Sequence, residues 1–281
     1  MSGGALIIIL GLVSAATWGA ADFFGGLAAK RSPANGVVIF GHLGSLFLLL
    51  PAAIISGEPL LSPMDWLIGM LSGVAAGSGL ILLYRSLADG QMSLASPVSA
   101  LVAALIPVMV GFWLEGFPGY LMLTGILLAL AAIWLIAQAG QINPSHLLAK
   151  LRLPLLSGIL FGLFYVGIHA ISSRSVFLPL VATRLGSISC LLLFTLLSRK
   201  PWLPDRSTWK YFGAISVLDT AGNLFYLLAA RLGRMDLAAV LGSLYPGSTV
   251  ALARLVLKER ISRSQWLGVA LALLALVLIS L

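Results

Sequence analysis

The amino-acid sequence predicts an all-α integral membrane protein with ten transmembrane helices in two inverted five-helix repeats. Its composition is typical of a membrane protein, because 60% of the 281 residues are hydrophobic and only 9% are charged. The chain also repeats itself at an offset of 143 residues, which aligns Gly19 with Gly162 and Trp66 with Trp209. Each copy holds an odd number of spans, so the second copy must cross the membrane in the opposite sense.

Each expected helix is an apolar run long enough to cross the hydrocarbon core, for which about 20 residues suffice. The runs are apolar throughout and do not alternate, so they indicate helices and not the strands of a membrane barrel. Turn and charged residues, such as Gly57 and Glu58, separate the runs. In chain order the expected helices occupy residues 4–28, 35–56, 65–84, 92–114, 119–138, 154–172, 177–198, 209–230, 236–257 and 264–281.

The longest interruption between runs divides the chain into its two copies. We expect a first five-helix repeat at residues 1–138, a linker at 139–153 and a second five-helix repeat at 154–281. Ten spans with short links fill this length, so no soluble domain is expected. The first run lacks a basic leader and is too long for the core of a signal peptide, so we expect it to persist as a helix.

The charged residues and the cysteine exclude several functional classes. The net charge of +8 does not predict nucleic-acid binding, because basic residues stand singly or in pairs at the ends of apolar runs. Cys190 is the only cysteine, which excludes an intrachain disulfide and a cysteine metal cluster. A phosphate-binding loop motif is absent from the sequence. We therefore expect no cofactor, metal or nucleic-acid partner, and we expect contacts with lipid and a small-molecule substrate.

The distribution of basic residues predicts a membrane orientation. Ten spans place both termini on one side, together with Arg174, Arg231 and Arg234, and place twelve lysines and arginines on the other. Basic loops are retained in the cytoplasm. The count therefore predicts a multi-pass protein of the cytoplasmic (inner) membrane with both termini outside.

Several short segments resemble the EamA-type repeats of the drug/metabolite transporter superfamily. They are residues 17–19 (Thr-Trp-Gly), 83–97, 233–239, and 243–246 followed by the Lys-Glu-Arg of 258–260. The resemblance covers essentially the whole chain. It implies a secondary transporter, by analogy an exporter, for amino acids, drugs or similar metabolites. It also implies cytoplasmic termini, against the charge count, so both orientations stay open at this point.

Asp22 is one of the few charged residues inside an expected span, where a charge costs roughly 2.5 to 3.5 kcal/mol on insertion scales. It follows Trp18 by one helical turn, so the two side chains share a face that we expect to line a substrate cavity. The alternative is that Asp22 anchors the helix end near the lipid headgroups, since Lys30 and Arg31 follow shortly after.

Asp219 and Asn223 lie one turn apart in the eighth run and form the densest polar stripe of any span. We expect both to contact substrate. The alternative is a structural ion pair, in which Arg184 of the neighbouring run neutralises Asp219 and holds the bundle together. The two hypotheses are compatible.

Tyr165 and His169 align with Asp22 and Gly26 of the first copy, and equivalent positions of inverted copies face each other across a cavity. We expect Tyr165 to bind substrate and His169 to bind substrate or carry a proton; a packing role for His169 is the alternative. His42 is expected to pack. Other candidates for the cavity wall are aromatic, with interfacial anchoring as the alternative role: Trp18, Tyr84 and Tyr245. The candidates for proton coupling are Asp22, His169 and Asp219.

Glycines and prolines in the spans point to packing or gating. Gly73 and Gly77 recur at a spacing of four, so a neighbouring backbone can approach one face of the third helix closely. Pro97, Pro107 and Pro246 each remove a backbone hydrogen bond and are expected to bend the fourth and ninth helices, as a static kink or as part of gating.

Other functions remain as alternatives to small-molecule transport. A passive channel or a flippase for lipids or lipid-linked sugars is the nearer alternative, because the same repeats can open a groove towards lipid. An intramembrane aspartyl protease using Asp22 and Asp219 is disfavoured, because neither residue stands in a Gly-x-Gly-Asp context. We therefore expect a protein that is not an enzyme, and that acts as a monomer or a homodimer.

Overall fold

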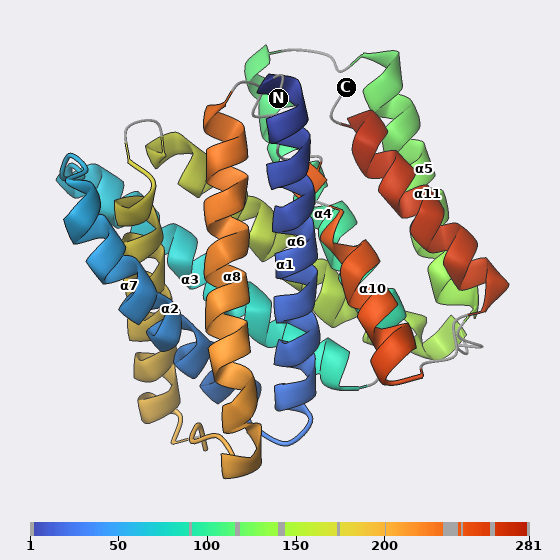
Figure 1. Cartoon of the computed structure of the whole chain (residues 1–281). Helices are drawn as coiled ribbons and strands as arrows, with labels where there is room; N and C mark the ends of the chain where they lie inside the picture. Colours follow the sequence, from blue (N-terminus) through green and yellow to red (C-terminus); the bar gives the residue numbers. More distant parts are fainter. Residues whose placement is uncertain are drawn as a thin grey trace.

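The computed structural model describes residues 3–89, 92–115, 119–139, 144–172, 175–199, 201–232, 241–242, 244–258 and 262–279. These residues form a helical bundle (Figure 1). The first half contains α1 (Gly3–Ala29), α2 (Ala34–Ser56), α3 (Pro63–Ala88), α4 (Met92–Glu115) and α5 (Tyr120–Ala139). The second half contains α6 (Pro144–Ile171), α7 (Phe177–Leu197), the short 3-10 helix η1 (Arg206–Thr208), α8 (Trp209–Arg231), α10 (Tyr245–Val256) and α11 (Arg263–Ile279).

The structure differs from the expected boundaries most clearly at the start of α6. This helix begins at Pro144, inside the segment expected to be a linker, and continues through Pro154. Proline is well tolerated at the first position of a helix, where its missing N–H would have no intrahelical partner anyway. The following residues, rich in leucine, alanine, lysine and arginine, are good helix formers. Residues 144–153 therefore belong to α6, and the connection between the halves is shorter than expected.

All three prolines expected to bend helices lie in described helices. Pro246 is the second residue of α10, and the ninth run is broken just before it, because residues 241–242 are helical and Leu244 lies in a turn ahead of α10. Pro97 lies inside α4 and is buried. The side chain of Pro107 lies outside the described residues, and so do residues 233–240 and 243 of the expected ninth run.

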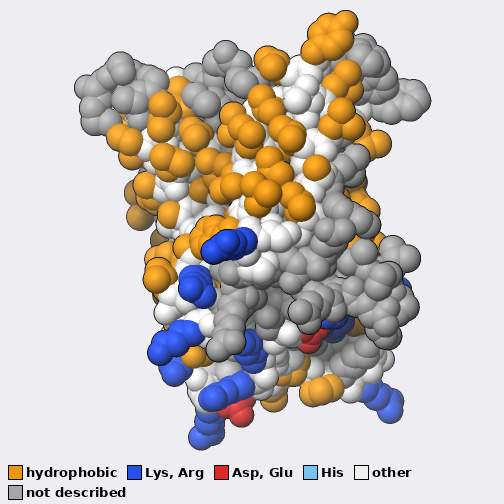
Figure 2. All heavy atoms as spheres, turned by 90° about the vertical axis from the view of Figure 1, so that its right-hand side faces the viewer, with side chains coloured by type: hydrophobic (Ala, Val, Ile, Leu, Met, Phe, Trp, Pro, Cys, Tyr) orange, Lys and Arg blue, Asp and Glu red, His pale blue; other side chains and the backbone are white. Residues whose placement is uncertain are grey.

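Six helices in the described part are long and apolar enough to cross a membrane: Leu6–Ala29, Ala34–Ser56, Pro63–Ala88, Lys150–Ile171, Phe177–Leu197 and Arg206–Ala229. Shorter apolar segments occur at Leu94–Ile106 and Trp266–Ala275. Both termini lie at one end of the bundle (Figure 1). On the face drawn in Figure 2, lysines and arginines gather towards the opposite end, and the hydrophobic side chains that are described are concentrated nearer the end that holds the termini. This distribution is that of a multi-pass membrane protein with a basic side.

The helix contacts follow the internal repeat, because most close pairs have an equivalent after the two halves are exchanged. The pairing of α1 with α8 corresponds to that of α6 with α3, and the pairing of α4 with α6 corresponds to that of α10 with α1. The pairs α2 with α7, α4 with α10 and α5 with α11 correspond to themselves. The halves therefore interlock, and the interior of the bundle is built largely between them.

Two glycines show how closely the halves obey this exchange. A Cβ atom at Gly79 would lie 3.0 Å from the Phe161 ring, and one at Gly222 would lie 2.5 Å from the Trp18 ring. These two contacts are equivalent, since the 143-residue offset takes Gly79 to Gly222 and Trp18 to Phe161. In both places a helix approaches an aromatic ring so closely that a larger residue than glycine would collide with it.

The loops also tie the halves together at both ends of the bundle. Glu58, in the α2–α3 loop, accepts hydrogen bonds from the backbone N–H groups of Val176 at 2.7 Å and Phe177 at 2.9 Å, at the start of α7. Such a carboxylate compensates the positive end of the helix dipole. At the other end, Asp205 N–H donates to the Ser32 hydroxyl at 2.9 Å. Hydrogen bonds from Ser207 lower the pKa of the exposed Asp205 carboxyl.

Candidate functional site

A cavity of about 60 Å³ lies where the two halves meet. The first half contributes side chains of α1 and α3, and the second half contributes side chains of α6, α7, α8 and α10. Its lining consists of Trp18, Asp22, Ala76, Leu80, Phe161, Phe164, Tyr165, Arg184, Asp219, Asn223 and Tyr245. This volume holds a few water molecules, at roughly 30 Å³ each in the liquid. It is well below the roughly 300 Å³ at which small-molecule pockets begin. A solute of metabolite size therefore fits only after the walls move.

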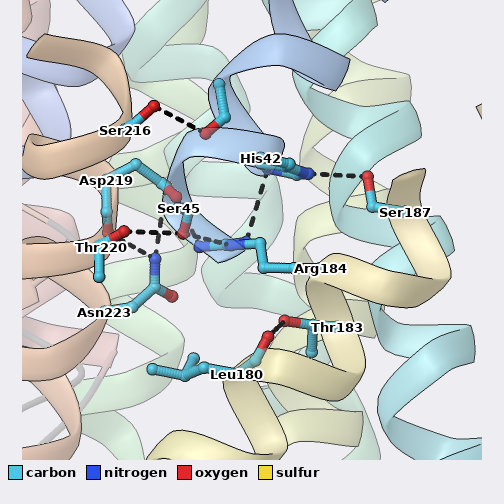
Figure 3. A network of polar contacts seen from close by, with 11 residues as sticks. His42, Ser45, Leu180, Thr183, Arg184, Ser187, Ser216, Asp219, Thr220 and Asn223 are labelled. Atoms are coloured by element: carbon cyan, nitrogen blue, oxygen red, sulfur yellow. Dashed lines mark hydrogen bonds and ion pairs between the residues drawn. The ribbon is translucent and has the colours of Figure 1, made fainter. Parts of the chain in front are cut away.

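An ion pair between α7 and α8 forms one wall of the cavity. The Arg184 Nη2 atom lies 2.5 Å from the Asp219 Oδ2 atom, and only 3% of the arginine side chain and 15% of the aspartate side chain are exposed. Figure 3 shows Arg184 extending from α7 between α2 and α8. Its Nε atom donates to the Ser45 hydroxyl at 2.9 Å, and its Nη1 atom lies 3.5 Å from His42 Nε2. Arg184 therefore joins three helices.

The same network continues on both sides of the ion pair. Ser45 and Thr220 share a hydrogen bond of 2.7 Å between their hydroxyls, which links α2 to α8. The Asn223 amide donates to the Asp219 carbonyl oxygen at 2.8 Å. A buried polar network in which every group has a partner favours a single arrangement of the helices. Any movement that separates two partners leaves a buried polar group without a hydrogen bond, which costs free energy. The pairing offered as the structural alternative for Asp219 is thus present, and Asp219 and Asn223 also face the cavity.

His42 is part of this network, although the sequence suggested only packing. Its Nδ1 atom lies 2.8 Å from the Ser187 hydroxyl on α7, and the histidine is buried. Ser45 follows His42 by three residues, so the two share one face of α2. That polar pair on one helical face was the available signal, and it was obscured by the glycines around it.

Asp22 differs from Asp219 in having no counter-ion. The aspartate is 8% exposed and lines the cavity, and within the described residues it makes no hydrogen bond or ion pair. The acidic and basic side chains of the lining are two aspartates, Asp22 and Asp219, and one arginine, Arg184. When all three are charged, the cavity carries a net charge of −1. The carboxylate that faces it without a partner is that of Asp22.

Trp18 and Tyr165 line the cavity and belong to a cluster of three aromatic rings that also includes Tyr226. The ring centroids of Trp18 and Tyr226 lie 5.6 Å apart, and those of Trp18 and Tyr165 lie 6.4 Å apart. Tyr165 and Tyr226 complete a three-ring cluster at 6.4 Å. Tyr245 lines the cavity from α10, and its buried hydroxyl makes no well-formed hydrogen bond in the described part of the chain, although the Ser99 side chain lies close to it. An unpaired buried hydroxyl beside a cavity is available to a ligand.

The structure brings together most of the residues expected at the site. Tyr84 is buried and does not line the cavity, and its ring packs so close to Gly25 that a Cβ there would lie 2.2 Å from Tyr84 Cζ. His169 is exposed in the last turn of α6 and is not part of the lining. Neither Tyr84 nor His169 is therefore among the residues that line this cavity. The expected residues that do line it are Trp18, Asp22, Tyr165, Asp219, Asn223 and Tyr245.

Comparison with known proteins covers both halves of the chain. Residues 5–138 and 149–281 each match the model of the EamA-like transporter family. A solved structure described only as the crystal structure of a protein superposes with a TM-score of 0.67 over 97% of this chain and 96% of its own. Its sequence identity is 17%, so this likeness concerns the fold alone.

Two curated proteins match about half of the chain each. A Yersinia pestis protein named undecaprenyl-phosphate alpha-N-acetylglucosaminyl 1-phosphate transferase is 35% identical over 130 residues, which are 43% of this chain and 34% of that protein. This chain thus spans about a third of that relative's length. An uncharacterized protein of Methanocaldococcus jannaschii is 29% identical over 129 residues, which are 44% of this chain and 93% of that protein.

Proposed function

The chain belongs to the EamA-like transporter family, and from this membership we propose a secondary transporter that moves small metabolites across the cytoplasmic membrane by alternating access. The observation that carries the proposal is the cavity between the halves, to which α1 and α3 of one half and α6, α7, α8 and α10 of the other contribute. In transporters built from inverted repeats, the substrate site lies at the repeat interface, and one half rocks against the other around it. By family analogy we favour export.

Ten spans with both termini outside are the topology that we propose for this activity. The contact pattern supports ten spans, because α4, α5, α10 and α11 pair with each other as the repeat requires. The basic end in Figure 2 lies opposite the termini and supports the orientation. A reporter fused to the C-terminus tests it: activity of a periplasmic reporter agrees, and activity of a cytoplasmic reporter contradicts it.

Proton coupling, if present, is best assigned to Asp22. Asp219 is already neutralised by Arg184 at 2.5 Å, and His169 lies outside the cavity lining. Asp22 is left as the cavity-facing carboxylate that has no hydrogen bond or ion pair to the residues that the structure describes. Its protonation state then differs most between an occupied and an empty cavity, which is what coupling requires.

Flux into proteoliposomes tests the proposal. A metabolite and toxicity screen of cells with and without the gene identifies solutes, and the flux of each is then measured with and without an imposed pH gradient. We expect flux that depends on the protein and is accelerated by the gradient, and we expect Asp22→Asn to remove the acceleration. A chain that moves none of the solutes from the screen contradicts the transport function. Flux that ignores the gradient removes only the proton coupling.

A flippase for lipid-linked sugars is the second candidate, and the name of the Yersinia pestis relative is the observation in its favour. The transferase activity in that name belongs to a protein of which this chain covers 34%, and we propose no enzyme activity here. An acid/base aspartate pair shares a proton between two carboxylates, whereas Asp219 is bonded to Arg184. Fluorescent lipid analogues in the same proteoliposomes distinguish flipping from flux of water-soluble solutes.

A further inference from the structure

We propose that the cavity recognises its solute by a positive charge, in the form of an ammonium group held between the Asp22 carboxylate and the aromatic rings beside it. This inference rests on the proposed transport function and names the substrate class of the same cavity. It follows from three features of the lining: its charge balance, the arrangement of its rings and the division of its walls into a polar and an apolar part.

The charge balance disfavours an anionic group. Arg184 is the basic residue of the lining. Each of its three guanidinium nitrogens already lies near a protein partner: Ser45, His42 and Asp219. Three of the five guanidinium N–H donors are thus engaged, and the charge of Arg184 is already balanced by Asp219, so an anionic solute would gain little from Arg184 and would be repelled by Asp22. A buried carboxylate without a counter-ion is costly, and a solute cation supplies the missing charge.

The rings favour a cation in the same place. Trp18 precedes Asp22 by one turn of α1, so its ring and the carboxylate lie on the same side of the helix. The faces of tryptophan and tyrosine rings carry negative electrostatic potential and attract ammonium groups. Tyr165 stands 6.4 Å from Trp18, between centroids, and Tyr245 adds a buried hydroxyl without a partner. That oxygen can accept a hydrogen bond from an ammonium N–H.

The remaining wall suits an apolar body attached to the charge. Ala76 and Leu80 of α3 and Phe161 and Phe164 of α6 line the cavity without polar side-chain atoms. The 143-residue offset pairs Ala76 with Asp219 and Leu80 with Asn223, so the polar groups of α8 have apolar counterparts on α3. An amine with a hydrophobic substituent satisfies both walls at once.

Binding to the full-length protein in detergent tests the inference with three probes that share a phenyl group and differ in charge. They are 2-phenylethylammonium, 2-phenylethanol and 3-phenylpropionate, and their dissociation constants are measured by isothermal titration calorimetry. We expect the ammonium to bind at least about ten-fold more tightly than the other two, and we expect Asp22→Asn to remove this preference. Asp65→Asn, at an N-terminal cap outside the cavity, is the matched control and should leave all three constants unchanged.

Tyr245→Phe keeps the test decisive if Asp22→Asn does not fold. It removes one hydroxyl whose contact with Ser99 falls short of a well-formed hydrogen bond, so we expect little change in thermal unfolding and ammonium binding weaker by about two- to five-fold. Equal binding of the alcohol or the propionate overturns the inference. So does ammonium binding that survives Asp22→Asn in a folded protein, or displacement of the ammonium by sodium at constant ionic strength, which would assign the carboxylate to an inorganic cation.

Flux of the same three probes separates this inference from the proposed function. Movement of the alcohol or the propionate without the ammonium leaves transport intact and overturns the cation preference. Asp22-dependent binding of the ammonium without flux of any probe, or of any solute from the screen, supports the recognition and contradicts transport.

Discussion

The contact of α3 with α7 and the contact of α8 with α2 are equivalent in the internal repeat, yet they are built with different chemistry. On α3, a Cβ atom at Gly73 would lie 1.9 Å from the Thr183 carbonyl oxygen, so the two backbones touch. On α8, the residue equivalent to Gly73 is Ser216, whose hydroxyl donates to the Gly41 carbonyl oxygen at 2.9 Å. One contact relies on close approach, and the other on hydrogen bonds.

The difference extends to the charged groups. Gly77 of α3 has Thr220 as its equivalent, and Gly41 of α2 has Arg184. The ion pair with Asp219 therefore has no counterpart across the repeat, where Ala76 and Gly41 stand. The repeat supplies a symmetric frame, and the substitutions that break its symmetry create the polar wall of the cavity.

The largest effect is expected from Asp219→Ala. This change leaves Arg184 buried without its carboxylate, and removal of one partner of a buried pair typically costs about 3 to 5 kcal/mol. Urea unfolding in mild detergent measures the loss. The double variant Arg184→Leu with Asp219→Leu replaces the buried ion pair with apolar side chains. It should lose less unfolding free energy than Asp219→Ala, because no buried charge is left without a partner. A double variant less stable than the single one would contradict this account of the pair.

Gly73→Ala should have the next largest effect, about 1 to 3 kcal/mol, because the added methyl group collides with backbone that has no room to move. Gly213→Ala on α8 is the matched control. A Cβ there meets nothing within 4 Å, so the change should be neutral or stabilise by roughly 0.5 to 1 kcal/mol through helix propensity. Equal effects of the two changes would show that close approach does not hold α3 to α7.

Thr220→Val is expected to cost about 1 kcal/mol by removing the hydrogen bond to Ser45 with little change in shape. Because Ser45 also accepts from Arg184, the loss should be smaller in a variant that already lacks Arg184. A double-mutant cycle of the two changes measures this coupling. Strict additivity would mean that the hydroxyl pair and the ion pair act independently.

The smallest effect is expected outside both contacts, at Asp205. The lowered pKa of this carboxyl means that its stabilising contribution is fully present above the pKa of the unfolded chain, about 3.9, and is lost as pH falls through the lower folded value. Thermal unfolding between pH 5 and pH 2 should therefore show a shallow loss that Asp205→Asn reduces. An unchanged pH profile in Asp205→Asn would assign the loss to other carboxylates.

The sequence predicted the helices and their symmetric arrangement, because the apolar runs and the 143-residue repeat extend along the whole chain. The expected runs overlap the helices of the described part of the chain, and Asp22 and Tyr165, paired by the 143-residue offset, both line the cavity. Side-chain direction near helix ends was harder to predict. His169 aligns with Gly26 but emerges exposed in the last turn of α6, because the exchange of halves fixes helix position and not the direction of each side chain.

Long-range polar partners were the other limit of the sequence. His42 meets Ser187, 145 positions away, and no local spacing reveals such a contact. Pro246 shows a related limit: the ninth run is broken beside it as expected, but the break precedes the proline, which is the second residue of the new helix α10.

Alternating access to the cavity between the halves is tested most directly by the accessibility of one cysteine. Cys190 is the only native cysteine, so Cys190→Ala with Leu80→Cys places a single thiol in the cavity lining. A membrane-impermeant maleimide is applied to right-side-out and to inside-out vesicles. The account predicts labelling from both sides, with protection by a transported solute. Labelling from one side only, under every condition of substrate and pH, would contradict it.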